Sequence, residues 1–391
     1  MTMKMLKRTW AEIDLDALRH NYETLTRNLP EGCRFLGVVK ADAYGHGAVP
    51  VARELQALGA GYLAVSNYEE ALQLRRADVS LPILILGYTP VEFAVDEAAL
   101  HITQEVHSLE YGKALSQALE GSGQTLTVHM KIDTGMSRLG FFAYDRPETV
   151  PELVELWNLK NLNVEGAFMH FAVADTASEL EYTRMQHQRF MEVLDALKEQ
   201  GIEPNIIHCA NSAATIAFPE YAHDMVRPGI ATYGLAPSDE MQGMADLQPL
   251  MSLKTTVAAI RPFEAGITVS YGRTYKTPAP RTIAVCPIGY ADGLQRRLSG
   301  NLHFLLHGKQ VPVVGRICMD MCMVDITNVP EAKVGDTVTV VGTDGGETVT
   351  WDDWAGQLGT ISYELVCDIN KRVPRLYRKN GEVVDKLQYI V

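Results

Sequence analysis

The sequence predicts an α/β protein in which an N-terminal (β/α)8 barrel is followed by a β-rich C-terminal domain. Between residues 34 and 234, short apolar runs rich in β-branched residues alternate with segments of helical periodicity. This alternation is typical of parallel strands that are covered by helices on both faces. Eight such units follow one another, and eight is the number that closes a barrel. After Pro249 the pattern changes to short alternating strands separated by turns, which indicates the second domain.

The barrel strands are expected at the eight apolar runs. These runs are Phe35–Lys40, Tyr62–Ser66, Ile83–Leu86, His101–Thr103, Leu126–Asp133, Glu165–His170, Asn205–Ala210 and Met225–Tyr233. Helices are expected between them. Ser108 can cap one of these helices. Phe190, Leu194 and Leu197 form an apolar stripe on another, which Gly201 ends.

The second domain should contain shorter, alternating strands, turns and one helix. Examples are the strands Lys254–Ile260, Arg281–Cys286 and Thr337–Val341, the turns at Asp344-Gly345-Gly346 and Asn380-Gly381, and a helix that opens at Thr350. The segment from Arg8 to Ile13 could pair with either domain. Because 391 residues exceed the usual size of one hydrophobic core, we expect two domains, 1–245 and 246–391.

The composition limits the partners and the location. A formal net charge of −13 argues against a nucleic-acid partner, because such proteins need concentrated Lys and Arg. The apolar run from Val79 to Val91 is too short to span a membrane and is interrupted by proline, so it is expected in the core. The charged N-terminal segment has no apolar stretch of signal-peptide length. We therefore expect a cytoplasmic protein without a membrane partner.

Two smaller features have ordinary explanations. A basic cluster indicates a solvated or interface face, with anion binding as the alternative. It consists of Lys371, Arg372, Arg375, Arg378 and Lys379. The six cysteines are scattered without paired CxxC spacing or histidine-rich spacing, which indicates reduced structural thiols and predicts no metal site.

Lys40 is the first candidate catalytic residue, because it ends the first predicted strand. Catalytic groups of (β/α)8 barrels lie at the carboxyl ends of strands. The residues before it, Phe35 to Val39, are apolar, and a buried lysine is costly unless chemistry or pairing uses it. Desolvation lowers the pKa of a lysine and supplies the neutral amine that forms a Schiff base with an aldehyde cofactor. The alternative is a lysine that ends its strand in solvent.

The residues around Lys40 decide between these alternatives. The run Val38-Val-Lys-Ala-Asp-Ala-Tyr-Gly-His-Gly47 resembles the cofactor-attachment signature of the alanine racemase family. The resemblance implies that Lys40 carries pyridoxal 5'-phosphate and that Tyr44 contacts its phosphate. It extends over essentially the whole chain, and each further match falls where the predicted fold would place a functional group.

The segment Lys131-Ile-Asp-Thr-Gly-Met-Ser-Arg-Leu-Gly140 resembles the family's fifth-strand motif. The resemblance implies that Arg138 approaches the phenolic oxygen of the cofactor and the substrate carboxylate. Lys131 is often carbamylated in this family, and it then holds that arginine as an anion. An unmodified lysine on the barrel wall is the alternative.

Two further motifs end the sixth and seventh strands. Met169-His-Phe-Ala172 implies that His170 stacks near the pyridine ring, although a lone histidine at a strand end is more often a satisfied core group. His208-Cys-Ala-Asn-Ser-Ala213 opens a helix, and the resemblance implies that Asn211, Ser212 and nearby backbone N–H groups bind the phosphate. A plain serine N-cap at Ser212 is compatible with this role.

The motif Val226-Arg-Pro-Gly-Ile-Ala-Thr-Tyr-Gly234 follows the eighth strand. The resemblance directs Arg227 at the pyridine nitrogen and the N–H groups of Gly229 and Ile230 at the phosphate. Arginine stays protonated, so it donates a hydrogen bond to that nitrogen without handing over a proton. The cofactor is then a weaker electron sink, which disfavours transamination and suits simple removal and return of one proton.

In the second domain the resemblance assigns residues of the substrate side. Tyr271 is the second catalytic base and contacts substrate, Tyr290 with Arg296 and Arg316 lines the corridor through which substrate enters, and the backbone N–H of Met319 reaches the substrate carboxylate. Tyr363 lies by the phosphate and the substrate side chain. Taken singly, any of these tyrosines would more often be a packing residue.

Together these matches imply an alanine racemase that interconverts L-alanine and D-alanine by two bases, Lys40 and Tyr271, acting on a pyridoxal phosphate aldimine. The product would supply cell-wall peptidoglycan. Family resemblance places Tyr271 and Met319 in the site of the other subunit of a homodimer. A serine or broad-specificity racemase is the nearest alternative, and the bulk of Tyr363 favours alanine. A non-catalytic pyridoxal phosphate carrier is the alternative from another class, but such a carrier resembles the barrel alone.

Overall fold

The computed structural model describes residues 8–144 and 146–390, which form two compact units. The barrel unit contains Leu18–Ala43 and Ala48–Gln248. Of the described residues, the β-rich unit contains 8–17, the short segment Tyr44–Gly47, and 249–390. Within the described residues, no helix is both long enough and apolar enough to cross a membrane.

The barrel unit is built on parallel strands in the order β10-β2-β3-β4-β5-β6-β8-β9. They are β2 (Arg34–Val38), β3 (Tyr62–Val65), β4 (Ile83–Ile85), β5 (Ile102–Val106), β6 (Leu126–Asp133), β8 (Leu162–Phe168), β9 (Ile206–His208) and β10 (Met225–Val226), with a short β7 (Phe141–Phe142) beside β6. Two backbone hydrogen bonds join the ends of this order, from Asp224 N–H to Ile207 O at 3.0 Å and from Arg227 N–H to Ala210 O at 2.8 Å. The predicted barrel is confirmed and nearly closed.

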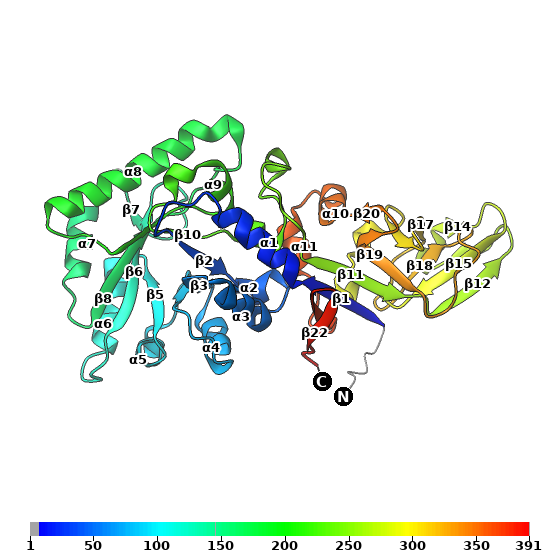
Figure 1. Ribbon diagram of the computed structural model, residues 1–391, viewed down its shortest axis with the longest axis horizontal. Helices are drawn as coiled ribbons and strands as arrows, with labels where there is room; N and C mark the ends of the chain where they lie inside the picture. The colour runs from blue at the N-terminus through cyan, green and yellow to red at the C-terminus, as the bar shows by residue number, and fades with distance from the viewer. Residues whose placement is uncertain (1–7, 145, 391) are drawn as a thin grey trace. The chain divides into compact units, whose positions relative to one another are not determined.

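Helices surround these strands (Figure 1). They are α3 (Ala48–Leu58), α4 (Tyr68–Arg76), α5 (Ala94–Ala99), α6 (Leu109–Ala118), α7 (Thr149–Trp157), α8 (Leu180–Glu199) and α9 (Ser212–Ala217), while α1 (Leu15–Thr26) begins at the unit boundary. Ser108 caps α6 as predicted and accepts a hydrogen bond from Tyr111 N–H. The stripe predicted on α8 is buried at Phe190 and Leu197.

Several predicted strands differ in their bounds from those observed, and two of them differ by three residues or more at the C-terminal end. The eighth was expected to reach Tyr233 but ends at Val226, and the residues Ile230–Tyr233 form a 3-10 turn instead. Pro228 lacks the N–H group that a strand ladder requires. The fourth, which is β5 in the structure, was expected to end at Thr103 but continues to Val106, because the polar side chains of Gln104 and Glu105 are fully buried.

A left-handed turn follows β2. Lys40–Tyr44 (α2) form one helical turn in which Ala41, Asp42, Ala43 and Tyr44 have φ between 51° and 55°. Four consecutive non-glycine residues in this region are rare, because Cβ crowds the carbonyl oxygen there. Such strain persists only where the surrounding structure holds it, and it gathers at functional sites.

The β-rich unit contains a sheet ordered β12-β15-β18-β17-β16-β19-β11-β1-β21-β22, with β20 beside β19. Its strands are β1 (Thr9–Asp14), β11 (Met251–Thr256), β12 (Ala259–Phe263), β15 (Arg281–Cys286), β16 (His303–Leu306), β17 (Lys309–Val314), β18 (Cys322–Asp325), β19 (Thr337–Asp344), β20 (Glu347–Val349), β21 (Arg375–Lys379) and β22 (Glu382–Leu387). The N-terminal strand β1 therefore pairs within this unit, antiparallel to β11 and parallel to β21.

The local signals of this unit are largely confirmed. Thr350 caps α10 (Trp351–Leu358) in a capping box, ahead of α11 (Ser362–Cys367). The predicted glycine turns join β19 to β20 and β21 to β22. The strand expected at Lys254–Ile260 is two strands, because Val257 N–H bonds to Asp336 O while Ala258 N–H bonds to Val285 O.

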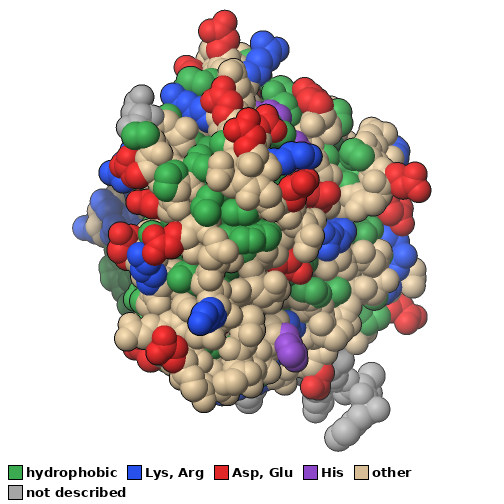
Figure 2. Space-filling model, turned by 90° about the vertical axis from the view of Figure 1, so that its left-hand side faces the viewer, with side chains coloured by type: hydrophobic (Ala, Val, Ile, Leu, Met, Phe, Trp, Pro, Cys, Tyr) green, Lys and Arg blue, Asp and Glu red, His purple; other side chains and the backbone are tan. Residues whose placement is uncertain are grey.

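Most charged side chains lie at the surface as the composition predicts, but Arg375 of the basic cluster is buried. Figure 2 shows a face on which acidic and basic side chains are interspersed, so no basic field gathers there. The basic cluster near the C-terminus is not a uniformly solvated face. Arg375 is 1% exposed, and its guanidinium donates to the carbonyls of Gly45 and Ile369. Carbonyl oxygens of the folded chain thus take the place of solvent around that cation.

Candidate active site

The barrel unit places five predicted site residues where its parallel strands end. Lys40 follows β2, Lys131 lies near the end of β6, and Arg138 is in the loop after β6. His170 follows β8, and Arg227 directly follows β10. The carboxyl ends of parallel strands meet at one rim of a barrel, where barrel enzymes bind their substrates.

Four cationic side chains of this rim act on one imidazole. Burial first, and then Arg227, Arg138, Lys40 and Lys131, hold the pKa of His170 well below its ordinary value. The imidazole ring of His170 is buried, although part of the residue is accessible to solvent. His170 is therefore neutral. A rim that gathers this much positive charge is suited to an anionic ligand such as a phosphate or a carboxylate.

Arg227 is 4% exposed and has no ion pair with an acidic side chain anywhere in the described ranges. Its Nη1 donates to His208 Nδ1 at 3.0 Å, and its Nη2 donates to the carbonyls of Met169 at 2.8 Å and Cys209 at 3.2 Å. Burial lowers the pKa of the guanidinium to about 10, so the group stays protonated at neutral pH. These acceptors fix the plane of the guanidinium without neutralising it.

A relay of side chains continues from Arg227 into the barrel. His208 Nε2 lies 2.9 Å from His129 Nδ1, and His129 Nε2 lies 3.2 Å from Glu165 Oε2. Because the guanidinium can only donate to His208 Nδ1, the proton of that ring is on Nε2, and it is donated to His129. His129 in turn donates to the carboxylate of Glu165, which holds the pKa of Glu165 below its ordinary value. Each ring therefore has one defined tautomer.

The loop that carries Arg138 is organised by Asp133, the last residue of β6. Its Oδ2 accepts the backbone N–H of Arg138 at 2.9 Å, and its Oδ1 accepts those of Gly135 and Ser137 at 2.9 and 3.0 Å. Asp133 is only 3% exposed. A buried carboxylate that accepts three backbone donors fixes the backbone of the loop from which the Arg138 side chain projects.

Lys131 lies on the barrel wall and is 6% exposed. Its Nζ is 5.7 Å from the centre of the Phe168 ring. Burial lowers the pKa of this lysine, Glu105 raises it, and Arg138 lowers it. The buried carboxylate of Glu105, which the sequence analysis did not single out, is thus the main negative group acting on Lys131.

The α9 start differs in one respect from the sequence expectation. Asn211, and not Ser212, is the N-cap, and its side chain accepts the N–H of Ala214 at 3.0 Å. Ser212 is the first helical residue, and its Oγ accepts the N–H of Gly229 at 2.8 Å and that of Ala231 at 3.3 Å. This serine therefore joins α9 to the turn containing Gly229 and Ile230, which brings the predicted phosphate-binding groups together.

In the β-rich unit, Tyr44 and Tyr363 lie near each other, with ring centres 6.3 Å apart. Burial, followed by the negative charge that Tyr363 and Cys367 would carry if ionised, raises the pKa of Tyr44. Tyr44 is thus a neutral hydroxyl. The next residue has to be a glycine, because a Cβ on Gly45 would lie 2.1 Å from the carbonyl oxygen of Val366.

Tyr271 lies on a loop between β13 (Thr268–Val269) and β14 (Tyr275–Lys276) and is 68% exposed. The loop is held by Ser270, whose Oγ donates to the carbonyl of Arg316 at 2.6 Å. Gly272 packs against the Arg316 side chain. The backbone at Tyr271 is therefore fixed, while its phenol projects from the unit.

The other predicted substrate-side residues lie on neighbouring loops. Tyr290 N–H donates to Cys318 O at 3.0 Å, and Ala291 N–H donates to Met319 O at 3.0 Å, so Tyr290 and Met319 are held side by side. Both are exposed, at 41% and 53%. Tyr290 and Arg296 line one depression of about 500 Å³. Tyr290, Arg296 and Met319 therefore lie close together on neighbouring loops of the β-rich unit.

Comparisons with known proteins extend over both units. Residues 13–237 match the family model described as "Alanine racemase, N-terminal domain", and residues 250–377 match "Alanine racemase, C-terminal domain". An alanine racemase of Desulfovibrio desulfuricans is 48% identical over 369 residues, which cover 94% of this chain and 97% of the relative. A solved structure of an alanine racemase of Clostridium difficile 630 has a TM-score of 0.94 at 42% identity, and the match covers 99% of this chain and 100% of that chain. A histidine racemase of Leuconostoc mesenteroides has a TM-score of 0.88 at 30% identity, covering 96% and 99%.

Proposed function

Because this chain belongs to the alanine racemase family of isomerases, we propose that it interconverts L-alanine and D-alanine with pyridoxal phosphate as its cofactor. The observation that carries this proposal is the group of four cationic side chains around the neutral His170 at the carboxyl rim of the barrel. Such a rim can hold both the phosphate of the cofactor and the carboxylate of an amino acid.

The residues present fit the proposed cofactor. Arg227 is a buried guanidinium whose described acceptors are carbonyls and imidazole nitrogens, not a carboxylate. A neutral pyridine nitrogen is an acceptor of the same kind, and Arg227 would donate to it without protonating it. The Ser212 junction with Gly229 and Ile230 would hold the phosphate, together with Asn211 and with Tyr44 and Tyr363. When bound, pyridoxal phosphate supplies the electron sink that makes the α-proton of alanine removable.

Different residues of the chain would then transfer the proton and orient the substrate. Lys40 Nζ would hold the cofactor aldehyde, and as a free amine it would move a proton at one face of the α-carbon of alanine. The phenolic oxygen of Tyr271 would move the proton at the opposite face. The guanidinium of Arg138, fixed by Asp133, would orient the alanine carboxylate, with the backbone N–H of Met319 as a second donor.

The active unit in this proposal is a homodimer. Tyr271 and Met319 are exposed at 68% and 53% on fixed loops, which supports a role in completing the site of a second copy. Tyr290, Arg296 and Arg316 would line the corridor to that shared site. In a symmetric dimer each chain gives these groups and receives them.

We also propose a covalent modification and a cellular role. Lys131 would be carbamylated, so that its new anion holds Arg138, and Glu105 would then face a second negative group.

We further propose that the protein acts in the cytoplasm and that its D-alanine serves peptidoglycan synthesis. A host lacking the gene, with no second racemase, should then need added D-alanine to grow, and unimpaired growth would contradict that role.

A racemase of wider specificity is the second candidate. The match to a histidine racemase supports considering it, since a shared fold does not fix the substrate. Serine is the nearest competitor by size, and Tyr363 is the residue proposed to exclude it. A carrier of pyridoxal phosphate without activity is disfavoured by the β-rich unit and its exposed Tyr271.

The proposal is tested by incubating the purified, cofactor-loaded protein with a panel of enantiopure amino acids and following optical rotation or chiral chromatography. We expect alanine to have the highest kcat/KM, with equal rates toward both enantiomers at equilibrium. A higher kcat/KM for serine or histidine would contradict alanine as substrate. Racemisation of none of the panel would support the carrier instead.

A further inference from the structure

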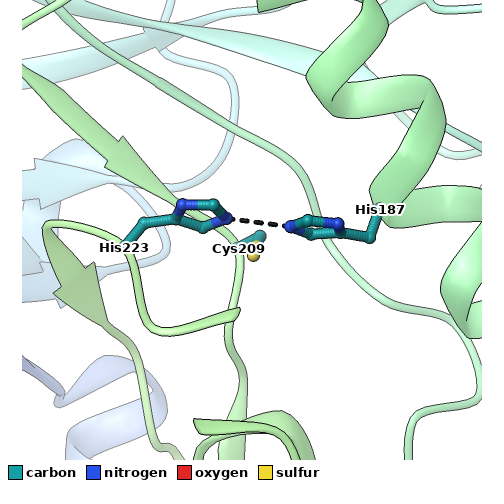
Figure 3. Close-up of side chains that lie close together, drawn as sticks. All are labelled: His187, Cys209 and His223. Carbon is teal, nitrogen blue, oxygen red and sulfur yellow. Dashed lines mark hydrogen bonds between the residues drawn. The ribbon is translucent and has the colours of Figure 1, made fainter. Parts of the chain in front are cut away.

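Three side chains with metal-binding atoms converge in the barrel unit at a place that the proposed reaction does not use (Figure 3). His187 lies in the middle of α8, Cys209 follows β9, and His223 lies just before β10. His208 faces Arg227, and side chains alternate along a strand, so the adjacent Cys209 faces the other way. The three residues therefore meet away from the cationic rim.

The atoms themselves are close. His187 Nε2 lies 2.9 Å from His223 Nε2, and the Sγ of Cys209 and one ring nitrogen of each histidine all lie within 4.8 Å of one another. Two imidazole nitrogens that face each other at this distance share one proton, because one must donate and the other accept. A pair of rings that shares a proton through their lone pairs can share a metal ion in its place.

We propose that His187, Cys209 and His223 form a binding site for a zinc-class divalent cation. Two imidazoles and one thiolate are a donor set that zinc and cobalt favour and that magnesium and calcium do not. A solvent molecule would complete the tetrahedron, because both histidines are partly exposed while Cys209 is buried.

The adjustment that binding requires is small and balances chemically. With Zn–N bonds of about 2.0–2.1 Å, the two nitrogens of a tetrahedral site lie about 3.4 Å apart, so the rings would separate by roughly half an ångström. The Cys209 thiol, which now donates to the carbonyl of Tyr221 at 3.1 Å, would release its proton to solvent and turn toward the ion. The shared imidazole proton would move to Nδ1 of the same ring. One proton is released for each ion bound.

The surroundings are built firmly enough to position the ligands. The ring of His187 stacks on Tyr221, with centres 4.1 Å apart and planes at 19°. Tyr221 itself stacks against Phe171 and Phe218. The carbonyl of Cys209 accepts from Arg227 Nη2. A bound ion would thus tie α8, the end of β9 and the loop before β10 together, one residue from the clamp on Arg227.

The scattered cysteines predicted no metal site, because sequence signals for such sites depend on ligands with short, regular spacing. Here the three ligands come from a helix, a strand end and a loop. Only the closing of the barrel between β9 and β10 brings them together.

The experiment titrates the chelator-treated holoenzyme with zinc by calorimetry and with cobalt by absorption spectroscopy. We expect one ion per chain, proton release, and a thiolate-to-cobalt charge-transfer band with the strong ligand-field bands of a tetrahedral site. Cys209→Ser should remove the charge-transfer band. Cys209→Ser and His223→Gln should each weaken binding by at least the roughly 10- to 100-fold that loss of an outer-shell partner costs.

Matched controls replace a thiol and an imidazole elsewhere in the barrel unit. Cys33→Ser and His20→Gln should bind zinc as the wild type does. Affinity that is unchanged in Cys209→Ser and His223→Gln would overturn the proposal, and so would a wild-type protein that binds no zinc. If Cys209→Ser fails to fold, His223→Gln and Cys33→Ser decide together: a charge-transfer band that is lost in His223→Gln and kept in Cys33→Ser supports the site, and a band that His223→Gln leaves unchanged overturns the proposal.

Discussion

The barrel unit and the β-rich unit hold their functional residues in opposite ways. In the barrel unit Lys131, Asp133 and Arg227 are nearly inaccessible, and hydrogen bonds hold Asp133 and Arg227 in place. In the β-rich unit Tyr271 and Met319 sit on pinned loops, but their side chains are open to solvent. The difference indicates that one unit presents a preformed cradle, whereas the other presents groups that are fixed in place and need a second surface to become buried.

The largest loss of racemisation should come from a substitution in the barrel unit. Replacing Lys40 by Ala should lower racemisation by at least about 10³-fold, because both the covalent attachment and one base are lost. The visible absorbance of the bound cofactor should shift to that of the free aldehyde. Lys198→Ala, at an exposed position, is the control. Normal turnover by Lys40→Ala would mean that another lysine binds the cofactor.

The next prediction tests whether the exposed groups act across a dimer. Lys40→Ala and Tyr271→Phe homodimers should each be nearly inactive. After dissociation and random reassociation of equal amounts, about half of the dimers are mixed and about a quarter of all sites are intact, if the sites are shared. Activity should recover toward that fraction. Heterodimers verified by mass spectrometry that remain inactive would place both bases on one chain.

Arg227→Glu should change the kind of chemistry as well as its rate. A carboxylate would let the pyridine nitrogen keep a proton, so we expect racemisation to fall by roughly 100-fold while transamination to pyruvate increases. Arg227→Lys keeps the charge and should show no such increase. Chiral chromatography with a pyruvate assay measures both products, and an unaltered product ratio in Arg227→Glu would show that Arg227 does not face the ring.

The histidines of the relay predict acid-sensitive stability of the barrel unit. Burial lowers the pKa of both His129 and His208 in the folded chain. At mildly acidic pH these imidazoles therefore bind protons in the unfolded chain but not in the folded chain. Stability should fall as the pH falls below about 6.5, by up to about 1.4 kcal/mol per pH unit for each histidine. Thermal unfolding between pH 7 and 5 measures this slope. His129→Asn should have a shallower slope, and an equal slope would argue against the relay.

The smallest effect concerns specificity. Tyr363→Asn should raise the ratio of kcat/KM for serine over alanine by about 10-fold, because it removes bulk and adds an amide that can bind a hydroxyl. Tyr363→Phe keeps the bulk and should leave the ratio near that of the wild type. A ratio that stays constant or falls in Tyr363→Asn would remove Tyr363 as the size filter.

Sequence reasoning was strongest where a signal is local. The turn at Asn380-Gly381, the cap at Thr350 and the strand β6 need only neighbouring residues, and they are confirmed. It failed where tertiary partners decide, as in the buried polar end of β5. The relay through His129 and Glu165 was missed for the same reason, because a polar residue in a strand looks exposed until the barrel closes around it.

The placement of strand β1 has a consequence for how this gene can be divided. β1 is the first element of the described chain, yet it pairs with both β11 and β21, which are more than a hundred residues apart. A C-terminal fragment starting at Pro249 would therefore lack the strand that joins the two parts of its sheet, and it would leave two open edges that can pair with other chains. Splitting the gene between the units should yield an insoluble second half, whereas supplying residues 8–17 as a separate peptide should rescue it.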